Sequence, residues 1–256
     1  MITYQLIDNV GKITLNRPNR YHAFIREMSL EFQDALDECN EDENVRCILI
    51  TAEGKAFCAG QDLSEFPEAN KIDFNKIITE HYNPIIHKVR NIEKPVIAAI
   101  NGVAAGAGAS IAICCDIIVA AKSASFVQAF SKIGLIPDSG GTFFLPRLIG
   151  MQKATGLMMT GDTISASEAL KIGMIYKVFE DKVFEEESWK IAKKLSKMPT
   201  KALGITKRLL NNSYINNLND QLDMEKECQV EAGNTKDFIE GVEAFLEKRM
   251  PKFKGN

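Results

Sequence analysis

The chain of 256 residues has few of the side chains that commonly bind metals. It has only 3 histidines, His22, His81 and His87, and they are scattered along the sequence. His81 and His87 are six residues apart on a predicted helix, so they do not share a face well. No group of histidines, cysteines and carboxylates has the spacing of metal ligands. The sequence therefore predicts no metal site, and we expect structural or surface roles for His81 and His87.

The 6 cysteines show no zinc-binding pattern. Most lie in apolar runs, and the adjacent Cys114 and Cys115 point to opposite faces of any regular element. We therefore expect buried, reduced thiols. Cys58 lies in a loop of interest, but no histidine is near it in sequence to activate it as a nucleophile.

The chain also lacks an excess of positive charge and a long hydrophobic run. Its 31 basic and 34 acidic residues give a net charge of −3, and no basic stripe suggests a nucleic-acid partner. No stretch is apolar enough to span a bilayer, which predicts no membrane partner. The first eight residues alternate like a strand and do not resemble a secretory signal, so we expect a cytoplasmic protein.

Motifs for several common enzyme mechanisms are missing. There is no Gly-x-Ser-x-Gly nucleophile turn and no P-loop lysine. Gly106 and Gly108 lack the third glycine of a dinucleotide-binding loop.

The pattern of apolar residues predicts an α/β core followed by helices. The 45% hydrophobic content is ordinary for a globular protein and is sufficient for a core. In the first part we predict strands over 2–8, 12–16, 45–51, 95–101, 117–121 and 124–128, and helices over 28–39, 72–91 (with Pro84 as a candidate interruption) and 110–115. Later we predict a strand over 174–179 and helices over 182–198, 200–211, 218–232 and 236–249. The predicted division is a core over 1–198 and a C-terminal helical region over 199–256 that packs on it.

Two turns rich in small residues are the most informative feature that is present. One covers residues 55–63 (KAFCAGQDL), the other residues 101–110 (NGVAAGAGAS), and each follows a strand-like run. Small residues after a strand let the backbone approach a ligand, and free N–H groups at such a turn or at a helix start stabilise negative charge. Two such turns could direct two N–H donors at one oxygen, which is the geometry of an oxyanion hole.

Asp138 is the most informative carboxylate. It lies in IPDSGG (136–141), with apolar residues before it and glycines after it. A carboxylate in a partly desolvated pocket has a raised proton affinity, which suits a general base that takes a proton from carbon. The same context equally suits a helix N-cap. For Asp62 and Asp116, which also border the loops, we favour structural roles.

Several motifs together resemble the enoyl-CoA hydratase/isomerase (crotonase) family. They are 16–18 (NRP), 55–63, 101–116, 133–142, 165–169 (SASEA) and 245–253 (FLEKRMPKF), in the order that the family shows. The resemblance implies a crotonase-like (ClpP/crotonase) spiral of β-β-α units with a C-terminal helical trimerisation region. It also implies an acyl-CoA thioester substrate whose oxygen is held by the backbone N–H groups of Gln61 and Ala107.

Three positions depart from the pattern of the family's hydratases. The two glutamates that activate water in those enzymes correspond here to Ser110 and Phe130, while Asp138 stands where hydratases usually have glycine. The resemblance therefore favours an isomerase, closest in motif to the 1,2-epoxyphenylacetyl-CoA and 3-enoyl-CoA isomerase members, with Asp138 as the catalytic acid/base. An enoyl-CoA hydratase and a non-catalytic acyl-CoA-binding subunit are the alternatives.

The resemblance also assigns residues to the coenzyme A and acyl sites. The predicted coenzyme A contacts are Ala23, Ala59, Asp62, Leu63, Phe245 and Lys248, the last with a solvated helix face as its alternative. Ser110 and Phe130 are predicted for the acyl pocket, with core packing as a further role for Phe130, and residues 64–79 are expected to line it. No separate cofactor is expected, because coenzyme A is part of the substrate. The helical tail predicts a homo-oligomer, either a trimer or a dimer of trimers.

Overall fold

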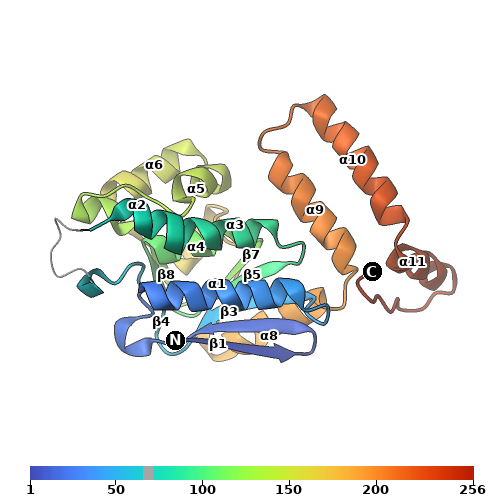
Figure 1. Cartoon of the computed structure of the whole chain (residues 1–256), viewed down its shortest axis with the longest axis horizontal. Helices are drawn as coiled ribbons and strands as arrows, with labels where there is room; N and C mark the ends of the chain where they lie inside the picture. Colours follow the sequence, from blue (N-terminus) through green and yellow to red (C-terminus); the bar gives the residue numbers. More distant parts are fainter. Residues whose placement is uncertain (66–71) are drawn as a thin grey trace.

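A large mixed sheet forms the centre of the molecule (Figure 1). The computed structural model describes residues 1–65 and 72–256. The large sheet has the order β1-β2-β3-β5-β7-β10 and consists of β1 (Ile2–Ile7), β2 (Val10–Leu15), β3 (Cys47–Ala52), β5 (Val96–Ile100), β7 (Ile117–Ala121) and β10 (Lys177–Phe179). In this sheet β1 and β2 are antiparallel, and the other pairs between described strands are parallel. All five residues of β5 are buried, as expected for an apolar strand that is covered on both faces.

A second, smaller sheet takes the other strand of each β-β unit. Its order is β4-β6-β8-β9, with β4 (Ala56–Cys58), β6 (Val103–Ala105), β8 (Ser125–Val127) and β9 (Thr163–Ser165). Thus β3, β5 and β7 enter the large sheet, and the strand that follows each enters the small one. This arrangement confirms the predicted β-β-α repeat. The three-residue β8 and β10 lie within predicted strands, whereas β4, β6 and β9 were not predicted. β4 and β6 lie inside the segments interpreted as small-residue turns.

Helices cover the sheets, and one of them is completely buried. The helices of this region are α1 (Arg26–Glu41), α2 (Phe74–Lys76), α3 (Asn83–Asn91), α4 (Ala107–Cys114), α5 (Gly141–Ile149), α6 (Met151–Thr160), α7 (Ala166–Lys171) and α8 (Phe184–Leu195). Every residue of α4 is buried, and its sequence of small and apolar residues fits a helix surrounded by protein. The helix predicted over 110–115 thus begins three residues earlier, and α5 and α6 were not predicted.

The helix predicted over 72–91 is interrupted in the structure. A π-helical segment, labelled η4 (Ile77–Tyr82), separates α2 from α3. Pro84 has no N–H to donate to the carbonyl of Glu80, so a regular α-helix cannot continue through this point. Side chains of α1 donate to two carbonyls of this segment: Gln33 Nε2 donates to Glu80 O (2.8 Å) and Ser29 Oγ donates to His81 O (2.8 Å).

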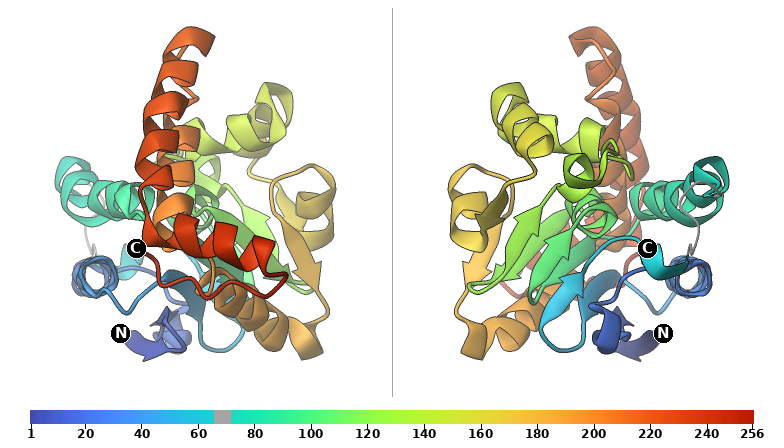
Figure 2. Two further views of the ribbon diagram at one scale, coloured as in Figure 1. Left: turned by 90° about the vertical axis from the view of Figure 1, so that its right-hand side faces the viewer. Right: turned by 90° about the vertical axis from the view of Figure 1, so that its left-hand side faces the viewer.

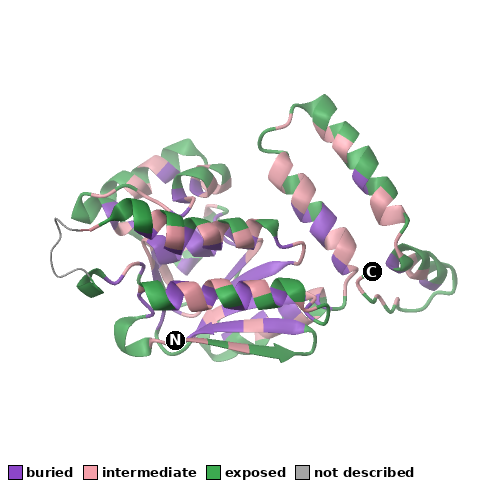
Figure 3. Cartoon of the chain, in the orientation of Figure 1, coloured by how far each residue is buried: buried purple, intermediate pink, exposed green. Residues whose placement is uncertain are grey.

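The C-terminal helices extend away from the sheets (Figure 2). They are α9 (Thr200–Asn212), α10 (Leu218–Gly233) and α11 (Lys236–Leu246), and α9 and α10 lie side by side. Arg46 connects this region to the core through Thr200 Oγ1 (2.9 Å), Met198 O (2.6 Å) and Phe253 O (2.8 Å). Most residues of α10 and α11 are exposed, whereas most residues of β2, β3, β5 and β7 in the large sheet are buried (Figure 3).

Candidate active site

The two small-residue turns lie next to each other because β4 and β6 are parallel neighbours. The loops that follow parallel strands emerge at the same edge of a sheet. Gly60 (φ +90°) and Gly106 (φ +52°) both have left-handed backbone conformations. A Cβ atom on Gly60 would lie 3.0 Å from Ala105 O and 3.3 Å from Ala107 N. Glycine at position 60 therefore permits the two backbones to approach closely.

Gln61 and Ala107 each present a backbone N–H at this junction. Phe24 pairs with the first turn: Phe24 N donates to Gly60 O (2.6 Å) and Asp62 N donates to Phe24 O (2.8 Å). Gln61 lies between Gly60 and Asp62 in an extended segment, so its N–H points away from Phe24. Ala107 is the first residue of α4, where N–H groups have no partner within the helix. Within residues 1–65 and 72–256, neither N–H donates a hydrogen bond, so both can donate to an anionic oxygen of a ligand.

A cavity of about 260 Å³ opens at these two residues. Its wall is mostly apolar and includes Leu63, Ile72, Phe74, Ile77, Ile78, Ala129, Phe130, Ile133 and Leu135, while the polar members are Gln61, Tyr82, Lys132 and Asp138. Four of these apolar residues belong to the segment 64–79 that was expected to line the acyl pocket; residues 66–71 of that segment lie outside the described part. A mostly apolar pocket with a few polar groups is typical of a small-molecule site.

Asp138 does not cap the helix that follows it. The N-cap of α5 is Gly140, and the contact of Asp138 with the start of this helix is made by its backbone carbonyl, which accepts from Gly141 N (2.8 Å). Its carboxylate accepts a hydrogen bond from Ser139 Oγ at Oδ1 (2.8 Å) and lines the cavity. Burial raises the pKa of this carboxyl, against the lowering effect of the Ser139 hydrogen bond. Of the two readings left open, the geometry favours the carboxylate as a proton acceptor.

The turn that presents Asp138 contains two consecutive left-handed residues. Ser139 has φ +51° and Gly140 has φ +72°. A left-handed conformation is uncommon for serine, and such strain is concentrated at functional sites. Ser139 is also 2% exposed, so surrounding protein holds it in place. Sequence analysis had not singled out Ser139, although its position between Asp138 and two glycines was a usable signal.

The residues predicted to contact coenzyme A fall into two groups. Ala23, Ala59, Asp62 and Leu63 surround the first turn, and Ala59 and Leu63 line the cavity. Both oxygens of the Asp62 carboxylate already have partners within the chain. Oδ2 pairs with Arg17 Nη1 (2.7 Å), and Oδ1 accepts from Ser64 N (3.0 Å) and Ser64 Oγ (2.6 Å). These bonds lower the pKa of Asp62, and the hydrogen bond from the Ser64 side chain has the largest effect. They match the structural role that we favoured for the Asp62 side chain.

Phe245 and Lys248 form the second group. They are exposed at the end of α11 and are not among the described residues that line the cavity of their own chain. Their contact with coenzyme A stays a prediction, which would require another copy of the chain.

Of the two residues predicted for the acyl pocket, Phe130 contacts the cavity and Ser110 lies behind the residues that line it. Phe130 lines the cavity, whereas Ser110 is fully buried in α4 and is not among the described lining residues. A Cβ on Gly141 would be 2.8 Å from Ser110 Oγ and 3.7 Å from Gln128 Oε1, so Ser110 supports the Asp138 turn from behind. Gln128, which sequence analysis had not singled out, is 4% exposed, and its side-chain amide has no hydrogen-bond partner among the described residues.

His22 and Cys58 have structural roles near the first turn. His22 Nδ1 accepts from Arg17 N (2.9 Å), which assigns the proton to Nε2 and makes that atom a donor to Glu53 O (2.7 Å). Burial raises the pKa of the Cys58 thiol to about 12, which keeps it protonated and unreactive. The six cysteines are free and buried, as predicted. Among the described residues no group of three or more histidine, cysteine or acidic side chains could hold a metal ion.

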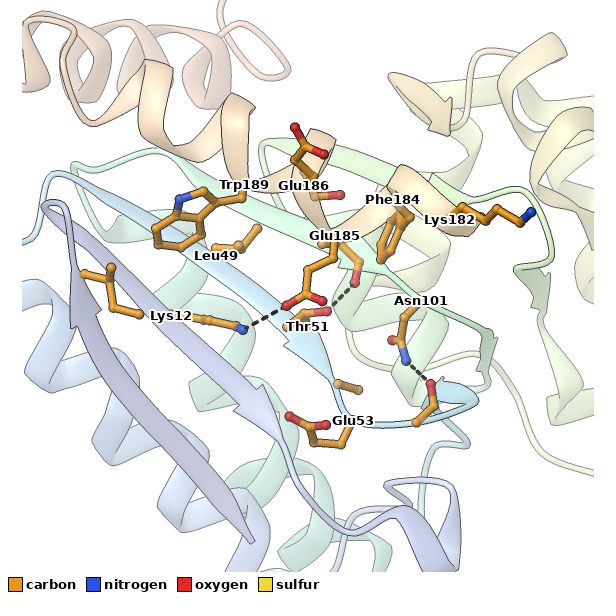
Figure 4. A pocket seen from close by; sticks show the side chains of 15 residues that line it. Lys12, Leu49, Thr51, Glu53, Asn101, Lys182, Phe184, Glu185, Glu186 and Trp189 are labelled. Atoms are coloured by element: carbon orange, nitrogen blue, oxygen red, sulfur yellow. Dashed lines mark hydrogen bonds and ion pairs between the residues drawn. The ribbon is translucent and has the colours of Figure 1, made fainter. Parts of the chain in front are cut away.

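A larger hollow lies elsewhere, between the large sheet and α8 (Figure 4). It measures about 670 Å³ and contains charged side chains, including Lys12 and Glu185 at 3.7 Å. Asn101 Nδ2 donates to Gly54 O (2.9 Å) at its edge. None of the predicted site residues lines this hollow, so its size does not make it the candidate active site.

Comparisons with known proteins agree on one family. The model of the enoyl-CoA hydratase/isomerase family matches residues 6–256. A 1,2-epoxyphenylacetyl-CoA isomerase from Escherichia coli is 44% identical over 96% of this chain and 95% of its own length. A probable enoyl-CoA hydratase from Rhodobacter capsulatus is 39% identical over 99% and 98%. A crystal structure of a putative enoyl-CoA hydratase/isomerase from Mycobacterium abscessus superposes with a TM-score of 0.95 at 37% identity, covering 100% of both chains. No helix within the described residues is long and apolar enough to cross a membrane.

Proposed function

Because the chain belongs to the enoyl-CoA hydratase/isomerase family, we propose that it is an acyl-CoA isomerase in which Asp138 moves a proton between carbon atoms of the acyl group. The observation that carries the proposal is the cavity in which Asp138 lies with the free N–H groups of Gln61 and Ala107. The substrate would be an acyl-CoA thioester with a misplaced double bond or a ring epoxide. The 44% identical relative is named as an isomerase of the second kind.

The proposed mechanism uses the cavity residues in a fixed order. The Asp138 carboxylate takes a proton from a carbon near the thioester, and the C–H electron pair delocalises onto the thioester oxygen as an enolate. The N–H groups of Gln61 and Ala107 stabilise that oxygen; one such donor contributes about 3 kcal/mol in known cases. The protonated Asp138 then returns its proton to another carbon, which shifts the double bond, or assists the opening of a strained epoxide. No atom is gained or lost overall.

The composition of the wall favours proton transfer over hydration. Among the described residues that line the cavity, Asp138 is the only carboxylate. The hydratases of the family are expected to use two glutamates on water, at positions that Ser110 and Phe130 occupy here. The Phe130 ring makes that part of the pocket apolar, and it offers no hydrogen bond with which to orient a water molecule.

Replacing Asp138 with asparagine tests the proposal. Asp138→Asn keeps the shape of the side chain but removes the proton acceptor, so turnover of the best 3-enoyl or ring-epoxide substrate should fall by about 10²–10⁴. Asp162→Asn, at an exposed position outside the cavity, is the matched control and should retain full activity. Near-normal turnover by Asp138→Asn would refute the proposal.

The same variant has an expected effect on stability. Because burial raises the pKa of Asp138, the folded state binds this proton more tightly than the unfolded chain does. The ionised carboxyl therefore destabilises the fold at pH 7, and this effect disappears as the pH falls below the ordinary aspartate pKa of about 4. Asp138→Asn should thus unfold at a higher temperature than the parent at pH 7 but not at pH 3.5. A lower unfolding temperature at pH 7 would contradict the desolvation of Asp138.

Two measurements separate the alternatives. A hydratase would incorporate oxygen from ¹⁸O-labelled water into its product, whereas the proposed isomerase would not. A non-catalytic binding subunit would bind acyl-CoA esters without converting any of a panel of 2-enoyl, 3-enoyl and ring-derived CoA esters.

We further propose a homo-oligomer, a trimer or a dimer of trimers, located in the cytoplasm.

A further inference from the structure

Tyr82 binds the side chain of the residue that supplies one oxyanion donor. Its hydroxyl donates to Gln61 Oε1 (2.8 Å), while Gln61 Nε2 donates to Glu65 Oε2 (3.0 Å). The Gln61 amide is therefore held at both ends. Tyr82 is 1% exposed and lines the cavity, so this contact forms inside the site.

The π-helical segment η4 determines where Tyr82 points. Tyr82 is the last residue of η4, immediately before the turn that contains Pro84. Ser29 Oγ and Gln33 Nε2 of α1 donate to the carbonyls of His81 and Glu80 in this segment. The Tyr82 ring also packs on Phe24 (centroids 6.2 Å apart), the residue that pairs with the backbone on both sides of Gln61. Tyr82 thus restrains Gln61 through its side chain and through its backbone neighbour. Single-turn π-distortions of this kind are frequent at functional sites.

Tyr82 is a hydrogen-bond donor under all ordinary conditions. Burial, and then the nearby Cys58 and Asp138, raise the pKa of its phenol well above 10. The hydroxyl therefore keeps its proton while Asp138 gains and loses one. It can restrain Gln61 throughout the reaction without exchanging a proton itself.

We propose that Tyr82 is a positioning residue that holds the Gln61 N–H in line with the thioester oxygen, an inference that rests on the oxyanion role proposed above. A small misplacement of a catalytic group can cost a large factor in rate. The backbone pairing with Phe24 restrains Gly60 and Asp62, whereas the Gln61 side chain is held by Tyr82 and Glu65. The effect of the Tyr82 hydroxyl should therefore appear in turnover and only weakly in substrate binding.

Tyr82→Phe separates the hydroxyl from the ring. We expect kcat to fall by roughly tenfold, less than the 10²–10³ of losing a whole donor, while KM changes by less than about threefold. Tyr4→Phe is the matched control: its hydroxyl is also buried but has no hydrogen-bond partner among the described residues, and it lies in β1. An unchanged kcat for Tyr82→Phe would overturn the proposal. A rise in KM alone would also overturn it, because it would indicate that the hydroxyl binds the substrate directly.

A double-mutant cycle tests whether Tyr82 acts through Gln61. Gln61→Met keeps the backbone N–H and the length of the side chain but cannot receive the Tyr82 hydrogen bond. If Tyr82 acts through Gln61, the double variant should be about as slow as either single variant. Additive losses would show that the two residues act separately and would contradict the proposal.

A spectroscopic measurement keeps this inference independent of the reaction. A saturated acyl-CoA with a ¹³C-labelled thioester carbonyl cannot isomerise, but two oxyanion donors should lower its C=O stretching frequency on binding. Tyr82→Phe should lose part of that shift while Tyr4→Phe retains it. If the parent protein shows the shift but has no isomerase activity, the proposed function fails and the Tyr82 inference remains. If the parent shows the shift and Tyr82→Phe leaves it unchanged, the Tyr82 inference fails alone.

Discussion

At the scale of single residues, the hydrogen bond between Ser139 and Asp138 adjusts the proton affinity of the site. Burial raises the pKa of Asp138, and the Ser139 hydroxyl opposes that shift by donating to the ionised form. A general base requires the ionised form at working pH. The two effects oppose each other: burial makes the Asp138 carboxylate a stronger base, and the Ser139 hydrogen bond favours the ionised form that can take a proton from carbon.

Ser139→Ala should therefore raise the pKa of Asp138 further. The acidic side of the profile of kcat/KM against pH should move to higher pH, because more of the carboxyl is then protonated. We expect activity at pH 5 to fall by roughly 3- to 10-fold and activity at pH 8 by less than about twofold. Ser139→Thr, which keeps the hydroxyl, is the conservative comparison. A uniform loss at every pH would show that Ser139 acts only on the shape of the turn.

At the scale of elements, the site depends on the close packing of α4 against β4. A Cβ on Gly108 would lie 2.6 Å from Cys58 Cβ, Cys58 O and Cys58 Sγ. Glycine at this position lets the buried helix approach the strand that leads into the Gln61 turn. The two donors are therefore positioned by one helix–strand contact.

Gly108→Ala should destabilise the fold by about 1–3 kcal/mol, since the backbone of β4 must move to accept the methyl group. The matched control is Gly156→Ala in α6, where an added Cβ meets nothing within 4 Å. That substitution should stabilise by about 0.5–1 kcal/mol, because alanine favours a helix over glycine. Urea unfolding of both variants measures the difference. Equal effects would contradict the packing described here.

At the scale of the whole molecule, the C-terminal helices present a surface that the core does not cover. On α11, Phe245 is 83% exposed, Leu246 73% and Phe238 53%. Contiguous exposed apolar side chains of this kind mark protein–protein contacts. They support the proposed homo-oligomer and the proposed approach of Phe245 to a neighbouring active site.

Leu246→Asp tests this surface. A charge placed within this exposed apolar surface should weaken self-association by at least about tenfold without loss of monomer stability. Glu243→Ala, an exposed position on the same helix, should leave association unchanged. Light scattering across a dilution series gives the molar mass directly. A parent protein that stays monomeric at high concentration would exclude the proposed oligomer.

The sequence alone was sufficient for the family, whose resemblance implied the β-β-α repeat, and for the buried thiols and the two glycine turns. The thiols and the turns depend on short-range patterns: an apolar strand such as β5, or a glycine where the backbone must be left-handed, can be recognised from neighbouring residues. The strands β4, β6 and β9 could not be recognised, because β4 and β6 lie within the small-residue turns and the pairing of all three is long-range.

The family resemblance implied that the Gln61 and Ala107 donors act on one oxygen, and the tertiary structure supplies the physical reason why they can meet, which is that β4 and β6 are neighbours in the small sheet. Only the tertiary structure shows that Gly140, and not Asp138, is the N-cap of α5 and that the Asp138 carboxylate lies in the cavity. The Tyr82 contact with Gln61 was likewise invisible in the sequence, since Pro84 suggested an interruption but not the π-helical segment that it produces. Local patterns determined which residues could act, and long-range packing decided which of them meet.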